Sequence, residues 1–238
     1  MRIIAVLCSL FLLSCAPKKE PLSAEEIIEK SIQFHDAKKQ WNSVNLAVHM
    51  QEPRVGNPKR FSVINLNNQE SSFQLQRNRD THISTHIVDK NGQATTLLDN
   101  GIVTDSLLIK KYRLEPKRNA SYHRFYKVML GLPMSLPENI QEIKEISKVD
   151  FNNHQSYKVE IVLKEPLFSK NWYVFFSQKD FKVLGVEMFF PDNPNKGERL
   201  VFEGEFESNG IKIPRMKHWY ELNNEYSGSD IIVSELKE

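Results

Sequence analysis

Apolar and polar side chains alternate along this chain in two rhythms, one helical and one extended. Within residues 24–38, Ile28 and Ile32 belong to an apolar stripe with the spacing of one helix face. Ser23 and Glu26 stand in front of that stripe as a capping box, in which each side chain accepts a hydrogen bond from the other residue's backbone amide. The pattern predicts a helix that ends near residue 38 and lies on a sheet through its apolar face.

From residue 44 onward, apolar positions recur every second residue, as in half-buried strands. Leu46, Val48 and Met50 alternate with polar or small residues. Similar runs lie at residues 61–66, 73–77, 82–89, 95–98, 102–107, 157–163, 172–176, 184–190, 200–206, 216–222 and 231–236. We therefore expect about ten or eleven strands.

Three Asn-Gly pairs punctuate these runs, at residues 91–92, 100–101 and 209–210. Both residues of such a pair tolerate a positive φ, which a type I′ hairpin requires, so the flanking strands are expected to be antiparallel neighbours. For the last pair the register follows directly. Phe206 should face Ile213 on one side of the sheet, while neighbouring charged residues pair on the other.

One segment departs from the strand pattern. Tyr122, Tyr126 and Met129 recur at helical spacing just before Gly131 and Pro133, which are typical of a helix end. This segment predicts a second short helix. The expected fold class is mainly β, an antiparallel curved sheet or half-open barrel whose concave face is covered by the two helices.

The first fifteen residues have the pattern of a secretory signal. Arg2 supplies a positive charge, and the apolar run at residues 3–13 is too short to span a bilayer as a helix. Leu12-Leu13-Ser14-Cys15 resembles the bacterial lipobox. That resemblance implies cleavage before Cys15 and acylation, typically with palmitate, at its thiol and new amino terminus. The alternative is an ordinary signal peptide with a chance cysteine.

These features divide the chain into three parts. Residues 1–14 are expected to be the signal peptide, residues 15–22 the lipidated cysteine and a solvated tether, and residues 23–238 a single β-rich domain. Ala16 stands where the sorting rule implied by the lipobox resemblance places an aspartate for inner-membrane retention. We therefore expect an acyl-anchored protein of the outer membrane, with the periplasmic face favoured over the cell surface.

Charge and cysteine content exclude several classes of protein. The chain has 32 Lys and Arg against 30 Asp and Glu, and loss of Arg2 with the signal lowers the net charge from +2 to +1. This near-neutral composition lacks the excess of basic residues that is expected of a nucleic-acid-binding protein. Of the two cysteines, Cys8 lies in the signal, which leaves Cys15 alone. An internal disulfide and a thiolate metal site are therefore not expected.

The sequence contains no pattern that nominates a catalytic or metal site, and no cofactor is expected. His82 and His86 stand about 13 Å apart if they lie on a strand, too far to share a metal ion, so we expect solvated strand histidines. Glu142, Glu145 and Asp150 lie in a charged stretch that is expected to be exposed. No GxSxG, P-loop or GxGxxG motif is present, and the protein is expected not to be an enzyme.

Aromatic side chains on the second-half strands and the second helix are the remaining signal. They are expected either to line an apolar pocket or to fill a core. The candidate ligand-binding residues are Phe125, Tyr126, Met129, Trp172, Phe176, Phe202 and Phe206.

Three segments resemble a family of uncharacterised lipoproteins of the Bacteroidota type. They are residues 24–35 with Trp41 after them, residues 122–133, which end in Met-Leu-Gly-Leu-Pro, and residues 201–214, which begin with Val-Phe-Glu-Gly-Glu-Phe and run into His218-Trp219-Tyr220. The chain departs from the family at the end of the first helix, where Phe34-His35-Asp36-Ala37 replaces His-Gly-Gly. The resemblance therefore does not define how the first helix ends in this chain.

That family in turn resembles the outer-membrane lipoprotein carrier and receptor proteins of the Lol pathway, in which helices cover the mouth of a half-open barrel that holds acyl chains. The resemblance implies a non-enzymatic, lipid-anchored envelope protein that binds lipid or a lipoprotein acyl chain. The N-terminal acyl anchor would attach this protein to the membrane. A structural or interaction lipoprotein with a filled core, and an envelope hydrolase, are the alternatives.

Overall fold

The computed structural model describes residues 21–236, so the predicted signal, Cys15 and most of the tether lie outside the described residues. Its strands are β1 Asn45–Gln51, β2 Phe61–Asn67, β3 Ser72–Arg79, β4 His82–Val88, β5 Ala94–Leu98, β6 Ile140–Phe151, β7 His154–Leu167, β8 Ser169–Ser177, β9 Val183–Phe190, β10 Asn193–Ser208, β11 Ile211–Glu221 and β12 Tyr226–Glu235. Its helices are α1 Ala24–His35, the short 3₁₀ turn η1 Trp41–Ser43, α2 Ser106–Tyr112, α3 Lys117–Leu130 and α4 Leu136–Asn139.

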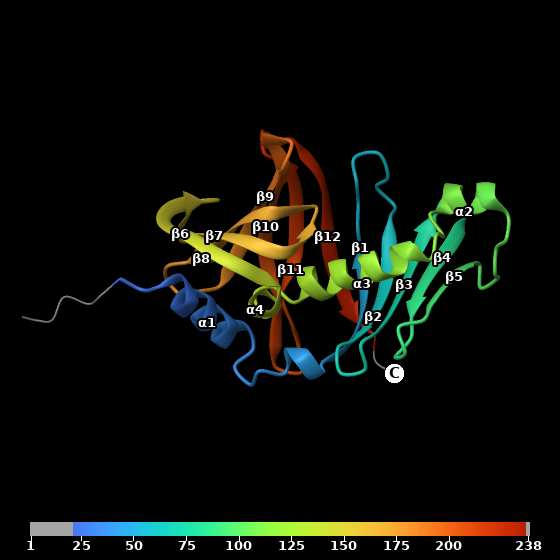
Figure 1. Ribbon diagram of the computed structural model, residues 1–238, viewed down its shortest axis with the longest axis horizontal. Helices are drawn as coiled ribbons and strands as arrows, with labels where there is room; N and C mark the ends of the chain where they lie inside the picture. Colours follow the sequence, from blue (N-terminus) through green and yellow to red (C-terminus); the bar gives the residue numbers. More distant parts are fainter. Residues whose placement is uncertain (1–20, 237–238) are drawn as a thin grey trace, which may run out of the picture.

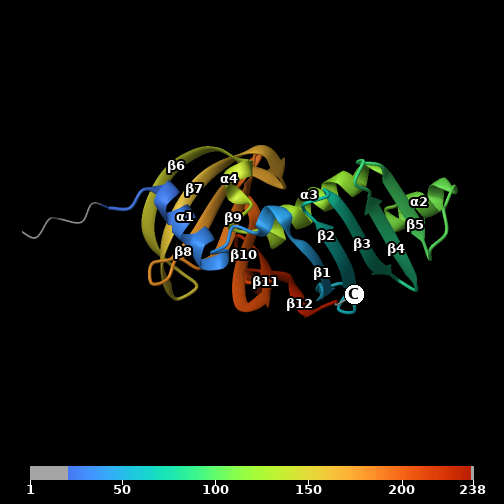
Figure 2. The ribbon, with the colours of Figure 1, turned by 90° about the horizontal axis from the view of Figure 1, so that it is seen from below.

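All of these strands belong to one antiparallel sheet with the order β5-β4-β3-β2-β1-β12-β11-β10-β9-β8-β7-β6. The chain builds β1–β5, crosses over through its helices, and returns from the far edge so that β12 pairs with β1. The sheet is curved and open, and the helices lie on one face of it (Figures 1 and 2). The mainly β, curved antiparallel class predicted from the sequence is confirmed.

Helix α1 begins as its capping box predicts. The Glu26 amide donates to Ser23 Oγ at 3.2 Å, and the Ser23 amide donates to Glu26 Oε2 at 2.7 Å. Ile27 and Ile28 are buried on the face that packs toward β6 and β11. The helix ends at His35, a few residues earlier than predicted.

His35 attaches this helix to two strands that are far apart in the sequence. Its Nδ1 bonds the Lys212 carbonyl oxygen at 2.7 Å, and its Nε2 accepts from the Val183 amide at 3.1 Å. Since Nε2 accepts, Nδ1 carries the proton and the imidazole is neutral. Burial lowers the pKa of His35 to about 4, which keeps it neutral at physiological pH.

Alternation of side chains builds the core as predicted. Leu46, Val48 and Met50 of β1 point inward and are nearly inaccessible to solvent, and β2 and β3 repeat the pattern. At the last Asn-Gly pair, Phe206 faces Ile213 in the β10–β11 hairpin, which confirms the predicted register. Asn209 and its glycine neighbour both have a positive φ, as a type I′ turn requires.

Three elements differ from the sequence prediction. Residues 102–107 were expected to form a strand, but Asp105 caps helix α2 by accepting from the amides of Leu107 and Leu108. Helix α3 begins at Lys117, one turn before the predicted aromatic stripe. The charged stretch at residues 142–150 is exposed as expected but forms edge strand β6, whose many solvated side chains hide the strand pattern.

The two halves of the concave face are filled differently. Between β6 and β11, helices α1 and α4 and the end of α3 pack onto the sheet, and Trp172 and Phe176 have no exposed surface. Over β2–β5, the first part of α3 lies on the sheet, and Tyr112 at the end of α2 packs against His82 of β4 (Figure 2). The interior beside α3 is therefore less completely covered.

We expect His35 to make the fold acid-sensitive. Its pKa is lowered from 6.5 to about 4, so the stability that the neutral ring contributes is complete above pH 6.5 and is lost as the pH falls toward 4. The free energy of unfolding in urea, measured between about pH 7 and about pH 4.5, should fall less steeply for His35→Gln, which cannot titrate.

Exposed His154 provides the matched control, and His154→Gln should follow the wild-type pH profile. Parallel pH profiles for wild type and His35→Gln would contradict this assignment of the acid sensitivity.

Candidate functional site

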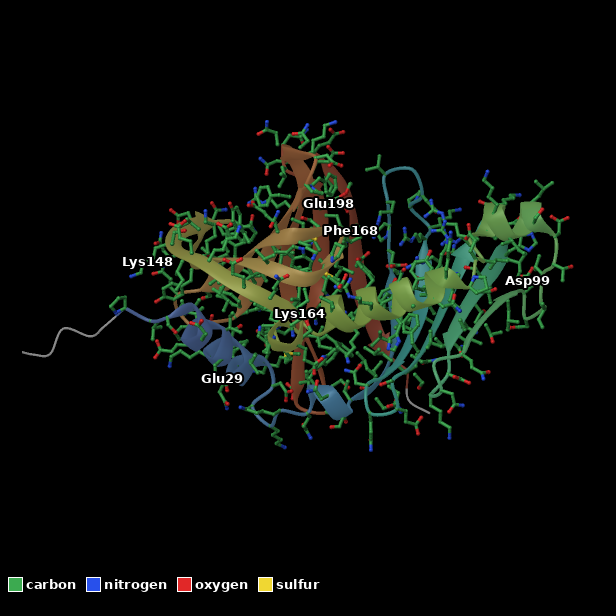
Figure 3. The ribbon with its side chains drawn as sticks, viewed as in Figure 1. Glu29, Asp99, Lys148, Lys164, Phe168 and Glu198 are labelled. Carbon is green, nitrogen blue, oxygen red and sulfur yellow. The ribbon has the colours of Figure 1, made fainter. Side chains whose placement is uncertain are left out.

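A cavity of about 720 Å³ opens where the two halves of the sheet meet. Its walls come from the β1–β2 loop, strand β3, helix α3, the β7–β8 turn and strand β11. Figure 3 labels Phe168 and Glu198, which border it near the middle of the molecule. The lining residues are Arg54, Arg60, Arg77, Arg79, Arg113, Ala120, Ser121, Tyr122, Arg124, Phe125, Tyr126, Pro166, Leu167, Phe168, Glu198, Trp219 and Ser227.

One wall of the cavity is aromatic. The ring centroid of Phe125 lies 5.8 Å from that of Phe168 and 6.3 Å from that of Trp219. The Phe168 and Trp219 rings meet edge to face at 5.9 Å. Trp219 is buried, whereas Phe168 keeps 55% of its surface exposed at the mouth of the cavity. The wall therefore presents apolar surface that the protein itself leaves uncovered.

Phe168 is held at the mouth by its backbone. It has φ 62°, a left-handed conformation that bulky residues rarely adopt. Helix α3 fixes the preceding residues, because Arg124 donates to the carbonyl oxygens of Pro166 at 2.5 Å and Glu165 at 2.6 Å. On the other side, Trp172 Nε1 donates to the Ser169 carbonyl oxygen at 3.1 Å. These contacts support a strained turn that keeps the Phe168 ring against Phe125.

A buried ion pair lies behind the opposite wall, and its arginine, Arg77, lines the cavity. Arg77 donates to Glu52 through Nη2 at 2.8 Å and through Nε at 3.1 Å. Tyr126 Oη donates to Glu52 Oε1 at 2.9 Å and accepts from Arg77, and Ser62 Oγ also donates to Glu52. The carboxylate and guanidinium groups are thereby satisfied within the protein.

The charge of Glu52 is fixed by these neighbours. Burial favours its neutral form, but Arg77 and Arg60, with the hydrogen bonds from Ser62 and Tyr126, lower the pKa of Glu52 to about 2. Burial raises the pKa of Tyr126. The carboxylate therefore stays ionised and the phenol stays protonated at physiological pH, which suits neither group to proton transfer.

The cavity is electropositive. Six arginines line it, from Arg54 in the β1–β2 loop to Arg124 in α3. Glu198 also lines the cavity, and two carboxylates behind the lining pair with its arginines: Glu52 with Arg77 and Arg60, and Asp230 with Arg54 at 2.5 Å. These groups leave three positive charges in excess, a local imbalance that the near-neutral composition of the whole chain conceals.

The sequence-predicted binding residues are divided between cavity and core. Phe125 and Tyr126 line the cavity. Met129, Trp172, Phe176 and Phe202 are buried in the packed core, and Phe206 packs against it half-buried; none of these five borders the cavity. Ligand binding by these residues stays a prediction.

The arginines escaped the sequence analysis because they belong to separate segments. The alternation of residues in β3 nevertheless indicated two of them. Phe73, Leu75, Arg77 and Arg79 occupy alternate positions of β3, so the two arginines continue the inward face of an apolar strand. A charged residue on such a face requires a partner, which here is Glu52 for Arg77.

His82 and His86 do not share a partner, but only His82 is solvated as expected. His82 pairs with exposed Asp99 at 2.5 Å, whereas His86 is fully buried and bonds Asn119 at 2.8 Å. The side chain of His86 follows the inward face of β4, opposite Leu75. Among residues 21–236, no group of three or more His, Cys, Asp or Glu is placed to hold a metal ion.

Replacement of Glu52 by glutamine tests the buried pair. Glu52→Gln keeps the shape of the side chain but leaves the Arg77 charge without its counter-ion, so we expect a loss of about 3 to 5 kcal/mol in the free energy of unfolding. Exposed Glu70 provides the matched control, and Glu70→Gln should change stability by less than about 0.5 kcal/mol. Equal unfolding midpoints for the two variants in urea would show that the pair does not stabilise the fold.

Two solved structures share this fold. A LolA superfamily protein from Nitrosomonas europaea is similar with a TM-score of 0.52 and 10% sequence identity, over 92% of this chain and 95% of that chain. A domain described as an outer membrane lipoprotein-sorting protein, from Vibrio parahaemolyticus, is similar with a TM-score of 0.50 and 11% identity, over 88% of this chain and 92% of that chain. These identities establish likeness of fold alone, and the predicted Lol-like architecture is confirmed at that level.

No curated protein matches the sequence. Within the part of the chain that the structure describes, no helix has the length and apolar content needed to cross a membrane. The model of DUF6503, a family of unknown function, matches residues 1–236. By that match over nearly its whole length, the chain belongs to the DUF6503 family.

Proposed function

We propose that this protein is a lipid-anchored envelope protein that binds an apolar ligand, a lipid or the acyl chain of a lipoprotein, in the cavity beside α3. One observation carries the proposal: the cavity has an aromatic wall whose outermost ring, Phe168, is 55% exposed. Exposed apolar surface in a concave site is typical of ligand binding. The cavity volume of about 720 Å³ lies within the usual range of small-ligand pockets.

The arrangement of polar groups supports binding over catalysis. Glu52, the carboxylate behind the arginine wall, is bound by Arg77, Tyr126 and Ser62 and has its pKa lowered to about 2. A general acid or base requires a pKa near the working pH. We therefore propose that the cavity holds its ligand without transforming it.

The N-terminal anchor supplies the cellular context of the proposal. Acylation at Cys15 would tether the domain to a membrane, and the residue after it favours the outer membrane. Two or three acyl chains anchor stably where one chain binds only marginally. A domain held at the periplasmic face would then be close to its lipid ligand.

Fluorescent fatty-acid titration of residues 16–238 tests the proposed binding. We expect micromolar affinity for wild type, and about tenfold or greater weakening for Phe168→Asn. Asparagine tolerates the left-handed backbone at this position, so the substitution removes the ring without adding backbone strain.

Leu107 on α2 provides the control, because its side chain is 76% exposed and does not line the cavity. Leu107→Ser should bind the probe as wild type does. Absence of probe binding by wild type, or equal binding by Phe168→Asn, would refute the proposed site.

A structural or interaction lipoprotein is the second candidate, favoured by the packed core between β6 and β11. Phe176 is fully buried there, so Phe176→Ala is expected to cost about 3 to 5 kcal/mol in the free energy of unfolding. This candidate predicts that large loss together with no ligand in the cavity beside α3. A loss below about 1 kcal/mol in urea unfolding would contradict a filled core at this position.

A further inference from the structure

We propose that the arginine wall of the cavity binds the phosphate group of an anionic lipid, whose acyl chain lies on the aromatic wall. The inference rests on the proposed function and deepens it by naming the class of lipid. It starts from the polar half of the cavity, which binding of an acyl chain alone does not explain.

Arg79 has the least satisfied guanidinium of this wall. It is half-buried on β3, and its nearest polar contact is Tyr122 Oη at 3.4 Å from Nη2. Its buried Nε has no hydrogen-bond partner, and no carboxylate pairs with it among the described residues. An inward-facing guanidinium whose buried N–H has no acceptor raises the free energy of the folded protein, unless an anion binds it.

Other guanidinium groups surround Arg79. Burial lowers its pKa, and the positive charges of Arg77, Arg113 and Arg60 lower it further, against the opposing effect of Tyr122. Like charges that converge in one cavity repel one another, so their proximity destabilises the empty site. A bound anion would replace that repulsion with attraction.

The backbone brings these groups together from three elements. Arg77 and Arg79 are alternate residues of β3 and share its inward side. Ser62 pairs with Arg77, so continuation of the same register places Arg60 opposite Arg79. Arg113 is the residue that ends α2, and its backbone is left-handed, with φ 58°. Several forked donors from different directions suit the oxygens of a phosphate group.

Not all six arginines are free to bind an anion. Arg77 is committed to Glu52, Arg54 to Asp230, and Arg124 to carbonyl oxygens of the β7–β8 turn. Arg60 shares Glu52 at a longer distance of 3.3 Å. Arg79 and Arg113 remain as the two cavity arginines that have neither an ion pair nor a side-chain hydrogen bond to a carbonyl oxygen among the described residues. They are the residues that a phosphate group would engage.

The polar and apolar walls are continuous, which favours an amphiphile over a free anion. The Arg77 guanidinium lies 5.8 Å from the centre of the Tyr122 ring, and the Arg54 guanidinium lies 5.9 Å from the centre of the Trp219 ring. Trp219 in turn packs against Phe125 and Phe168. One molecule with a phosphate group and an acyl chain would contact both walls.

Calorimetric titration of the protein with short-chain lipids tests the inference. The probes are dioctanoylphosphatidylglycerol, which carries the phosphate, and dioctanoylglycerol, which has the same chains without it. Glycerol 3-phosphate and inorganic phosphate represent the anion without a chain. We expect the phospholipid to bind about tenfold or more tightly than dioctanoylglycerol, and both soluble phosphates to bind more weakly than the phospholipid.

Substitution of the two unpaired arginines should remove this preference. Arg79→Gln and Arg113→Gln are expected to reduce the affinity for the phospholipid toward that for dioctanoylglycerol, with dioctanoylglycerol binding unchanged. Lys148 lies at the far end of the sheet (Figure 3), so Lys148→Gln removes the same charge away from the cavity and should keep the preference. Thermal unfolding followed by circular dichroism verifies that each variant is folded.

The outcomes separate this inference from the function on which it rests. Equal affinity for phospholipid and dioctanoylglycerol, with no effect of Arg79→Gln, would overturn the inference and leave lipid binding intact. Inorganic phosphate that binds as tightly as the phospholipid would overturn the lipid assignment in favour of a soluble anion. Absence of binding by both lipids would overturn the proposed function as well.

Discussion

The buried ion pair between Glu52 and Arg77 is the contact on which the arrangement of the site depends. It joins the end of β1 to β3, and Tyr126 adds helix α3 through hydrogen bonds to both partners. Two charges in the interior are tolerated only because their remaining polar atoms are satisfied. The pair thereby fixes the distance of α3 from the sheet, and with it the base of the cavity.

The cavity itself follows from an uneven covering of one continuous sheet. Helices α1 and α4 pack over β6–β11, where Trp172 and Phe176 fill the interior, whereas the first part of α3 and the end of α2 cover β2–β5. Between the two regions, the β7–β8 turn contacts α3 through Arg124 and places Phe168 opposite Phe125. A packed half gives the domain its stability, and the junction provides room for a ligand with both polar and apolar parts.

Local pattern was sufficient to predict most of the fold. Alternation in residues 44–50 and the Asn209-Gly210 turn predicted strands, their antiparallel order and one register correctly. Strand β6 was missed because an edge strand has few buried positions, and α2 because the Asp105 cap outweighed the apolar alternation of residues 102–107.

The site was less accessible to sequence reasoning. Periodicity shows which side of a helix or strand faces the interior, but a packed interior and a cavity give the same periodicity. Phe125 and Phe176 therefore look alike in the sequence, although one lines a cavity and the other is fully buried. The contacts of Arg79 and Arg113 depend on long-range register and on the position of α2, which no local pattern contains.

The central claim is that the cavity beside α3 holds a lipid. Native mass spectrometry of residues 16–238, followed by organic extraction and lipid identification, tests it most directly. The account predicts one lipid per protein, with an acyl chain and a phosphate group, that is depleted in Phe168→Asn. A protein that is empty after gentle purification, and stays empty after incubation with phosphatidylglycerol, would contradict it.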